Sequence, residues 1–231
     1  QIGLEETPGE YIEKLVQVFR EVKRVLRNDG TCWLNLGDSY AAQGVSGLNV
    51  STKSGTFHGG KKDAHQRTRT LSEGFKPKDL MMIPARVAIA LQDDGWYLRS
   101  DIIWHKPTAM PESVTDRPTS AHEHIFLLAK SERYFYDADA IAEPTMVGAN
   151  GSSFMRGKTA HHENQGKSDY DFKPTRNKRN VWTVTSQPYA EAHFATMPPK
   201  LVEPCILAGS RSGDIVMDCF CGAGTVPMVA L

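Results

Sequence analysis

The sequence lacks an apolar run long enough to cross a membrane. A transmembrane helix needs about 20 consecutive apolar residues, and polar or charged side chains interrupt every apolar stretch of the 231 residues. No secretory signal segment is visible at Gln1, which stands where a start methionine would be expected. A membrane partner is therefore not expected. The apolar content of 40% suits one large domain with a substantial core.

Cysteine is also sparse. The four cysteines are Cys32, Cys205, Cys219 and Cys221. None of them has the Cys-x-x-Cys spacing that holds zinc, and the closest pair lies within a glycine-rich turn. We therefore expect no metal site and four free thiols, as in a reducing cytosol.

Net charge is absent, because 27 basic residues balance 27 acidic ones. A uniform distribution of charge would argue against a nucleic-acid partner. Instead, segment 41–76 has six basic residues against two acidic ones, and segment 145–180 has seven against three. Both segments have few apolar side chains, which is typical of a polar loop or insert. Phosphate contact depends on local charge, but polar loops also collect lysines, so charge alone leaves both interpretations open.

Apolar periodicity and turn residues predict alternating helices and strands. A capping box at Thr7–Glu10 begins the first helix, and Asn28-Asp29-Gly30 ends it. The other predicted helices are 78–92, which Pro84 makes unfavourable as one unbroken run, and 199–208; the predicted strands are 31–36, 96–106, 125–129, 134–136 and 215–217. The strands 125–129 and 134–136 read as a hairpin. The pattern therefore predicts an α/β fold with a mostly parallel sheet and an antiparallel hairpin at its edge.

The last residues of the chain hold its most informative motif. The predicted strand 215–217 runs into Asp218, a glycine turn follows at Gly222-Ala-Gly224-Thr225, and an apolar helix start comes next. Strand, glycine turn and helix form nucleotide pockets at the carboxyl edge of α/β sheets. The turn has neither the Gly-Lys-Ser/Thr of a phosphate loop nor a full Gly-x-Gly-x-x-Gly. By itself it could be an ordinary tight turn.

The wider pattern resembles a known family. The run Asp218-x-Phe-x-Gly-x-Gly-Thr225 resembles the S-adenosylmethionine loop of amino-group (cytosine-N4 or adenine-N6) site-specific DNA methyltransferases, with Cys219 for the usual proline and Ala223 for the usual serine. Segments 103–107, 122–131 and 193–201 are similar to the same family, and the resemblance extends from Gly3 to Thr225. It implies a class I, Rossmann-like methyltransferase fold in the family's beta arrangement, where the catalytic half precedes the cofactor half.

The resemblance also implies a domain organisation. Residues 1–231 would be a single methyltransferase domain that is incomplete at both ends, with a polar insert at 41–76 and a target-recognition region at 145–180. The family's Pro-Pro-aromatic catalytic motif is expected upstream of Gln1, and its ribose-binding acidic residue beyond Leu231. Within the chain, Asp38 is the candidate for the active-site edge, with capping of local backbone groups as the alternative.

The remaining site residues follow from positions that match the family. The cofactor residues implied are Asp218, Phe220, Gly222, Gly224, Thr225, His193, Thr196, Pro198 and Leu201. A core histidine is the alternative for His193. The DNA-contacting residues implied are Lys106, Arg117, Lys158, Lys173, Arg176, Lys178 and Arg179. A solvated loop competes with DNA contact at each of these cations.

The function implied is methyl transfer from S-adenosylmethionine to an exocyclic amino group of a flipped base. Similarity of Gln1–Glu5 and Asn35–Asp38 to restriction-associated enzymes favours cytosine N4. The alternatives are adenine N6, a non-catalytic DNA-binding or assembly subunit, and a methyltransferase for RNA or a small molecule. The resemblance implies double-stranded DNA as partner and a cytoplasmic enzyme from a bacterium, archaeon or phage. It leaves open a cognate restriction endonuclease and a homodimer.

Overall fold

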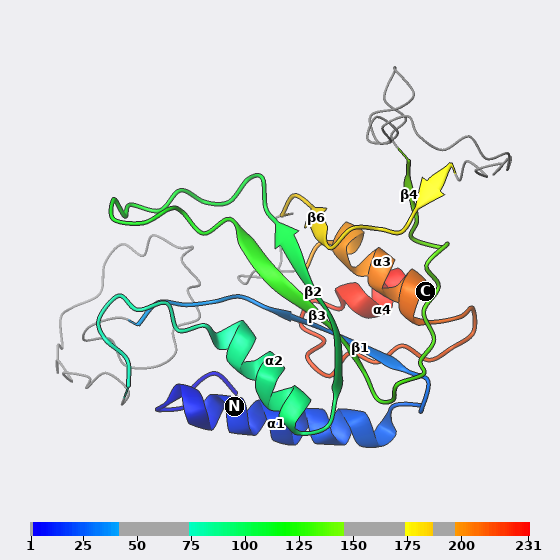
Figure 1. The fold of residues 1–231 in the computed structure, drawn as a ribbon, viewed down its shortest axis with the longest axis horizontal. Coiled ribbons are helices and arrows are strands. Elements are labelled where there is room, and N and C mark those ends of the chain that lie inside the picture. Colours follow the sequence, from blue (N-terminus) through cyan, green and yellow to red (C-terminus); the bar gives the residue numbers. More distant parts are fainter. Residues whose placement is uncertain (1, 42–73, 146–173, 187–196) are drawn as a thin grey trace, which may run out of the picture.

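A computed structural model describes residues 2–41, 74–145, 174–186 and 197–231 of the chain. Most of the predicted insert 41–76 and of the predicted target-recognition region 145–180 lies outside these ranges. The elements are α1 (Pro8–Val25), β1 (Thr31–Leu36), α2 (Ile83–Asp93), β2 (Tyr97–His105), β3 (His122–Ala129), β4 (Glu143–Pro144), β5 (Thr175–Arg176), β6 (Val181–Thr183), α3 (Pro199–Gly209) and α4 (Thr225–Ala230). Figure 1 shows their arrangement.

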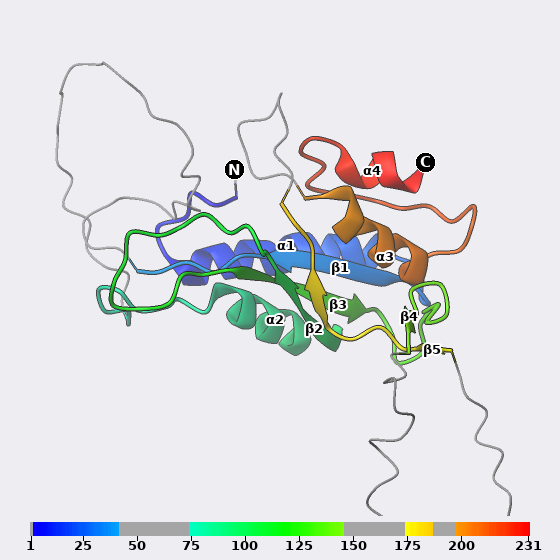
Figure 2. The ribbon, with the colours of Figure 1, turned by 90° about the horizontal axis from the view of Figure 1, so that it is seen from above.

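The main sheet has the strand order β1-β3-β2-β6. Strand β3 is antiparallel to both β1 and β2, whereas β6 is parallel to β2. Strands β1, β2 and β6 therefore run in one direction, and their carboxyl ends lie at the edge of the sheet where β3 begins. A separate two-stranded pair, β4–β5, stands outside this sheet in both Figure 1 and Figure 2.

Helices cover both faces of the sheet. Helices α1 and α2 lie together on one face (Figure 1), and their buried side chains share a core with Leu34, Phe126 and Leu128 of the sheet. Helix α3 covers the other face, where Leu201 packs with residues of β2, β3 and β6. This three-layer packing confirms the predicted α/β class.

The first helix forms as its sequence predicts. The Thr7 hydroxyl accepts a hydrogen bond from the Glu10 backbone N–H at 3.2 Å, and a proline occupies the first turn. Leu15, Phe19 and Val22 are buried along one face of the helix. The capping box and the apolar spacing therefore placed this element correctly.

The predicted hairpin of strands 125–129 and 134–136 is wrong. Both hydrogen-bonding edges of β3 are already taken, by β1 on one side and β2 on the other, so no edge is left for the residues that follow it. The aromatic side chains of 134–136 make other contacts. Tyr136 stacks on Trp33 with ring centroids 6.5 Å apart, and the Tyr134 hydroxyl accepts a hydrogen bond from Arg99 at 3.0 Å. The antiparallel strand is therefore internal to the described sheet.

The predicted strand 215–217 is also wrong for the described structure. These residues pair with no strand of the described ranges, and Ile215 is 96% exposed. An apolar β-branched run favours extended backbone, but a strand also needs a partner edge to hydrogen-bond with.

Of the helices in the described ranges, none has the length and apolar character that a bilayer crossing requires.

Helix α2 begins at Ile83, five residues later than predicted, because Pro84 is tolerated only in the first turn of a helix. The residue before it, Met82, is left-handed (φ 53°) and provides no side-chain cap. Asp38, 45 residues earlier in the sequence, caps the helix instead. Its Oδ1 accepts hydrogen bonds from the backbone N–H groups of Ile83 at 3.0 Å and Ser39 at 2.8 Å.

This capping role is testable by substitution. We expect Asp38→Ala to lower the free energy of unfolding by about 1 kcal/mol, the typical cost of losing a helix cap. Asp38→Asn retains a side-chain oxygen and should stay close to the unaltered protein. Chemical denaturation followed by circular dichroism would measure both variants. Equal unfolding free energies for Asp38→Ala and the unaltered protein would contradict the capping role.

Candidate functional site

The predicted glycine turn is present and has the backbone geometry that its sequence requires. Asp218 Oδ1 accepts a hydrogen bond from the Phe220 N–H at 2.9 Å, which closes the first bend. Gly222 (φ 50°) and Gly224 (φ 77°) then adopt left-handed conformations, and the Gly224 N–H donates to the Cys221 carbonyl at 2.8 Å. A Cβ on Gly222 would meet nothing closer than 3.5 Å. The backbone angle, rather than crowding, is therefore what requires glycine.

Phe220 lies at the tip of this turn with its ring only partly covered. The ring centroid is 6.4 Å from that of Phe19 on α1, and Phe220 is 50% exposed. Thr225 follows as the first residue of α4. The turn therefore presents an open aromatic surface beside a backbone that carries no Cβ at two positions, an arrangement that can accept a flat ring with an attached chain.

Two of the predicted cofactor residues lie in the core. Leu201 and Pro198 are among the most deeply buried side chains, and Leu201 packs against Ile102, Trp104 and Trp182. Their side chains have no free surface for a cofactor, because the apolar start of α3 is needed to cover the sheet. The predicted residues His193 and Thr196 lie outside the described residues.

Lys106 and Arg117, predicted to contact DNA, both already have partners. The Lys106 ammonium pairs with Glu123 and lies 4.2 Å from the centroid of the Trp104 ring, with its side chain only 19% exposed. The Arg117 guanidinium pairs with Glu112 and lies 3.8 Å from the Tyr40 ring centroid. Each cation is therefore held by one carboxylate and one aromatic face in the isolated chain.

The predicted cations in and after β5 also have partners, either a carboxylate or an aromatic ring. Glu143 of β4 accepts hydrogen bonds from Arg176 Nε at 3.0 Å and Arg179 Nε at 2.6 Å. Lys178 lies 5.3 Å from the Trp182 ring centroid. Lys158 and Lys173 lie outside the described residues. The β4–β5 pair therefore forms a stem on either side of segment 146–173, with two arginines sharing one carboxylate and Lys178 against an aromatic ring.

Sequence reasoning missed the partners of these cations. Glu123 was recognisable, because it lies in a His-Glu-His run immediately before the apolar part of β3. Its carboxyl group would be 3.5 Å from a Cβ placed on Gly37, so residues following β1, β2 and the start of β3 meet at one edge. Tyr40 and Glu143 gave no such signal, because their partners are distant in the sequence. Glu112 lies only five residues from Arg117, but in a loop with no periodic pattern that would pair them.

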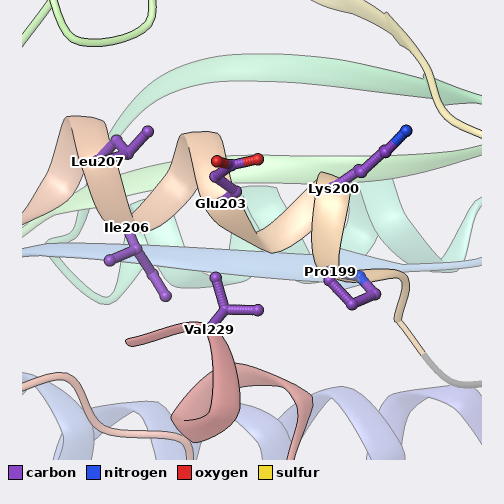
Figure 3. Close-up of a pocket in the computed structure, with 6 residues that line it drawn as sticks. All are labelled: Pro199, Lys200, Glu203, Ile206, Leu207 and Val229. Atoms are coloured by element: carbon purple, nitrogen blue, oxygen red, sulfur yellow. The ribbon is translucent and has the colours of Figure 1, made fainter. Parts of the chain in front are cut away.

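Two grooves lie on the described surface away from the glycine turn, and the second of them is lined in part by Asp38. One, of about 360 Å³, separates α3 from α4 and is lined by Pro199, Lys200, Glu203, Ile206, Leu207 and Val229. Figure 3 shows Ile206 and Val229 pointing toward each other across it. The other, of about 200 Å³, lies beside α2, and its rim holds the His124–Asp101 pair at 2.9 Å.

Comparison with known proteins decides the family. A DNA methylase family model, covering N6- and N4-type enzymes, matches residues 1–231. The chain belongs to this DNA methylase family. It is 48% identical over 229 residues to the Type II methyltransferase M.XycI of Xanthomonas campestris pv. cyanopsidis and 45% identical over 229 residues to M.Cfr9I of Citrobacter freundii. Each match covers 99% of this chain but 66% of the relative, so the chain spans just under two thirds of their length.

Solved structures agree with the DNA methylase fold. The PvuII DNA methyltransferase (cytosine-N4-specific) is similar with a TM-score of 0.61 and 18% identity, over 96% of this chain and 63% of that chain. The modification methylase TTHA0409 of Thermus thermophilus, solved with S-adenosyl-L-methionine, gives a TM-score of 0.53 and 19% identity, over 96% and 67%. These likenesses confirm the predicted class I methyltransferase fold.

The thiols of this DNA methylase chain differ sharply in environment. Burial raises the pKa of the Cys32 thiol to about 12, and burial does the same for Cys205. Partial burial also raises the pKa of Cys219. Cys221, in the glycine turn, is exposed. The reactivity of Cys32 and Cys205 therefore depends on the packing of the core, and that of Cys219 and Cys221 on the exposure of the turn.

Alkylation would test this difference. At pH 8 we expect iodoacetamide to modify Cys221 first and Cys219 next, because the thiolate is the reactive species and both turn residues are accessible. Cys32 and Cys205, which are partly buried, should react much more slowly in the native protein, since their high pKa values suppress their thiolates. Peptide mass spectrometry after timed quenching would measure the order. Labelling of Cys32 in the native protein as fast as Cys221 would contradict the packing described.

Proposed function

We propose that this chain carries the cofactor turn and part of the DNA-facing surface of a methyltransferase. The enzyme would transfer a methyl group from S-adenosylmethionine to an exocyclic amino group of a flipped DNA base, with cytosine N4 as the target. The observation that carries the proposal is the turn from Asp218 to Thr225, whose two left-handed glycines and open Phe220 ring match the motif of the DNA methylase family. Relatives that are 48% and 45% identical are named Type II methyltransferases.

The residues of the turn fit the proposed cofactor. Gly222 and Gly224 leave the backbone open to close approach by the amino-acid part of the molecule, and Phe220 offers its ring to the adenine. Asp218 holds the turn through its bond to the Phe220 N–H. The cofactor, when bound, supplies an electrophilic methyl group, so the chain needs no covalent nucleophile. None of the cysteines is assigned such a role.

The paired cations support contact with a polyanion through exchange of partners. A phosphate oxygen accepts charge-assisted hydrogen bonds as a carboxylate does, so DNA could replace Glu112 at Arg117 and Glu143 at Arg176 or Arg179. Such an exchange contributes less binding free energy than a new ion pair would, because the existing ion pair must first be broken and its carboxylate is left without a partner. We propose that residues 145–180 supply target recognition on the β4–β5 stem.

The choice of cytosine N4 rests on similarity of the segments 1–5 and 35–38 to restriction-associated enzymes. Adenine N6 is the alternative, because both bases present an aromatic amine once flipped. A non-catalytic DNA-binding subunit is the alternative from another class. The intact cofactor turn favours an enzyme over that alternative, since a purely structural chain has no use for it.

Cofactor binding would be tested at Gly222. In the complete protein we expect Gly222→Val to weaken binding of S-adenosylmethionine about tenfold or more, because left-handed backbone costs a side chain roughly 1–2 kcal/mol and tenfold in affinity is about 1.4 kcal/mol. Gly3→Val is the matched control, since Gly3 also has a positive φ (94°) but lies far from the turn in the sequence. Calorimetry would measure both. Equal affinity in Gly222→Val and the unaltered protein would exclude this turn as the site.

The reaction product would decide the target base. We expect DNA treated with the complete protein and S-adenosylmethionine to contain N4-methyldeoxycytidine, identified by digestion to nucleosides and mass spectrometry. N6-methyldeoxyadenosine as the only product would overturn the cytosine assignment and leave the proposed cofactor site intact. Cofactor binding without any methylated product would favour the non-catalytic subunit.

A further inference from the structure

The segment that leads into the cofactor turn contacts α1, or residues just beyond its end, at two points. On the other side of the turn, α4 packs against α3. Between the two contact points, residues 215–217 form no strand, with Ile215 96% exposed and Met217 54% exposed. Sequence motifs for the cofactor site lie entirely in the last part of the chain. The contacts at these two points involve residues nearly two hundred positions earlier.

The first attachment is a network of four charges. Arg27, just beyond the end of α1, donates to Asp214 at 3.0 Å and to Asp29 at 3.0 Å. Arg211 donates to Asp29 at 3.3 Å, its backbone N–H donates to Asp214 at 2.9 Å, and its guanidinium lies 3.9 Å from the Phe135 ring centroid. Asp214 is therefore held from two sides immediately before the exposed run.

The second attachment is aromatic. Phe19, buried on α1, lies with its ring centroid 6.4 Å from that of Phe220 at an interplanar angle of 48°. This contact comes two helical turns before Arg27 along α1. The chain from Asp214 to Phe220 therefore runs alongside α1, held at its beginning by charge and at its end by ring packing.

We propose that Arg27 and Phe19 are positioning residues for the cofactor turn, acting through Asp214 and Phe220. The inference rests on the proposed function. The six residue steps from Asp214 to Phe220 can span up to about 20 Å when extended, so a segment released at Asp214 samples many more positions. Binding then requires ordering that segment, which weakens affinity without removing any contact to the cofactor.

Arg27 separates this role from general stability. Its side chain is 64% exposed, and α1 is held to the core by Leu15, Phe19 and Val22. Loss of an exposed ion pair changes folding stability little. Arg24 is a matched control, because it lies in the last turn of the same helix, is 69% exposed, and pairs with Glu21 at 2.8 Å rather than with the cofactor segment.

The experiment compares Arg27→Gln and Arg24→Gln in the complete protein, using S-adenosylmethionine as the probe. We expect Arg27→Gln to raise the Kd about threefold to fivefold, the scale of one well-placed surface ion pair, and Arg24→Gln to leave it within about twofold. Steady-state kinetics should show a higher KM for S-adenosylmethionine in Arg27→Gln, with kcat and the KM for DNA unchanged. The double variant Arg27→Gln/Asp214→Asn should weaken binding by less than the two single variants combined, because both remove the same ion pair.

The outcomes distinguish failure of the positioning role from failure of the proposed function. If the unaltered protein binds S-adenosylmethionine and Arg27→Gln binds it equally well, the positioning role is overturned and the proposed function stands. A fall in kcat with an unchanged KM for S-adenosylmethionine also overturns it, because that result indicates only loss of folded enzyme. Failure of the unaltered protein to bind the cofactor overturns the proposed function and the inference together.

Discussion

The double pairing of β3 is the interaction on which the rest of the described structure depends. This strand hydrogen-bonds to β1 along one edge and to β2 along the other, and its residues Leu128 and Ala129 are completely buried. Because β3 runs opposite to both neighbours, the carboxyl ends of β1 and β2 lie beside its first residues. That geometry brings Gly37, Lys106 and Glu123 together from three separate parts of the chain.

The same geometry accounts for the paired cations. A lysine at the end of β2 would be expensive to bury alone, and Glu123 at the start of β3 lies within reach to neutralise it. Tyr40, after β1, provides an aromatic face for Arg117 in the β2–β3 connection. Lys106 and Arg117 are thus held in place before any ligand arrives. Ordered side chains lose less conformational entropy on binding. For a cation that exchanges its carboxylate for a phosphate, this saving would partly offset the free energy of breaking the ion pair.

Helix α1 serves both as a core element and as a support. Leu15, Phe19 and Val22 bury its apolar face against the sheet, and the residues at and beyond its end reach the segment that leads to the glycine turn. Residues 215–217 have no strand partner in the described ranges, so these contacts, together with the packing of α4 on α3, position the glycine turn.

The local features of this protein were determined by the sequence alone. The capping box began α1 and the alternation of apolar residues marked β1, because each depends on neighbouring residues. Gly222 and Gly224 allowed the left-handed turn, because glycine has no Cβ to clash there. The motif Asp218–Thr225 is also local in sequence, so the resemblance that it carries indicated the family without any structure.

Only the tertiary structure decided the pairing of elements and the partners of charges. The segment 134–136 resembles a strand, but β3 had no free edge for it. Leu201 and Pro198 match a cofactor segment, yet the need to cover the sheet placed them in the core. Asp38 was a candidate for the active-site edge with capping as the alternative, and the structure shows it capping a helix that begins 45 residues later. Strand edges, buried surface and ion pairs join residues far apart in the chain, so no local pattern specifies them.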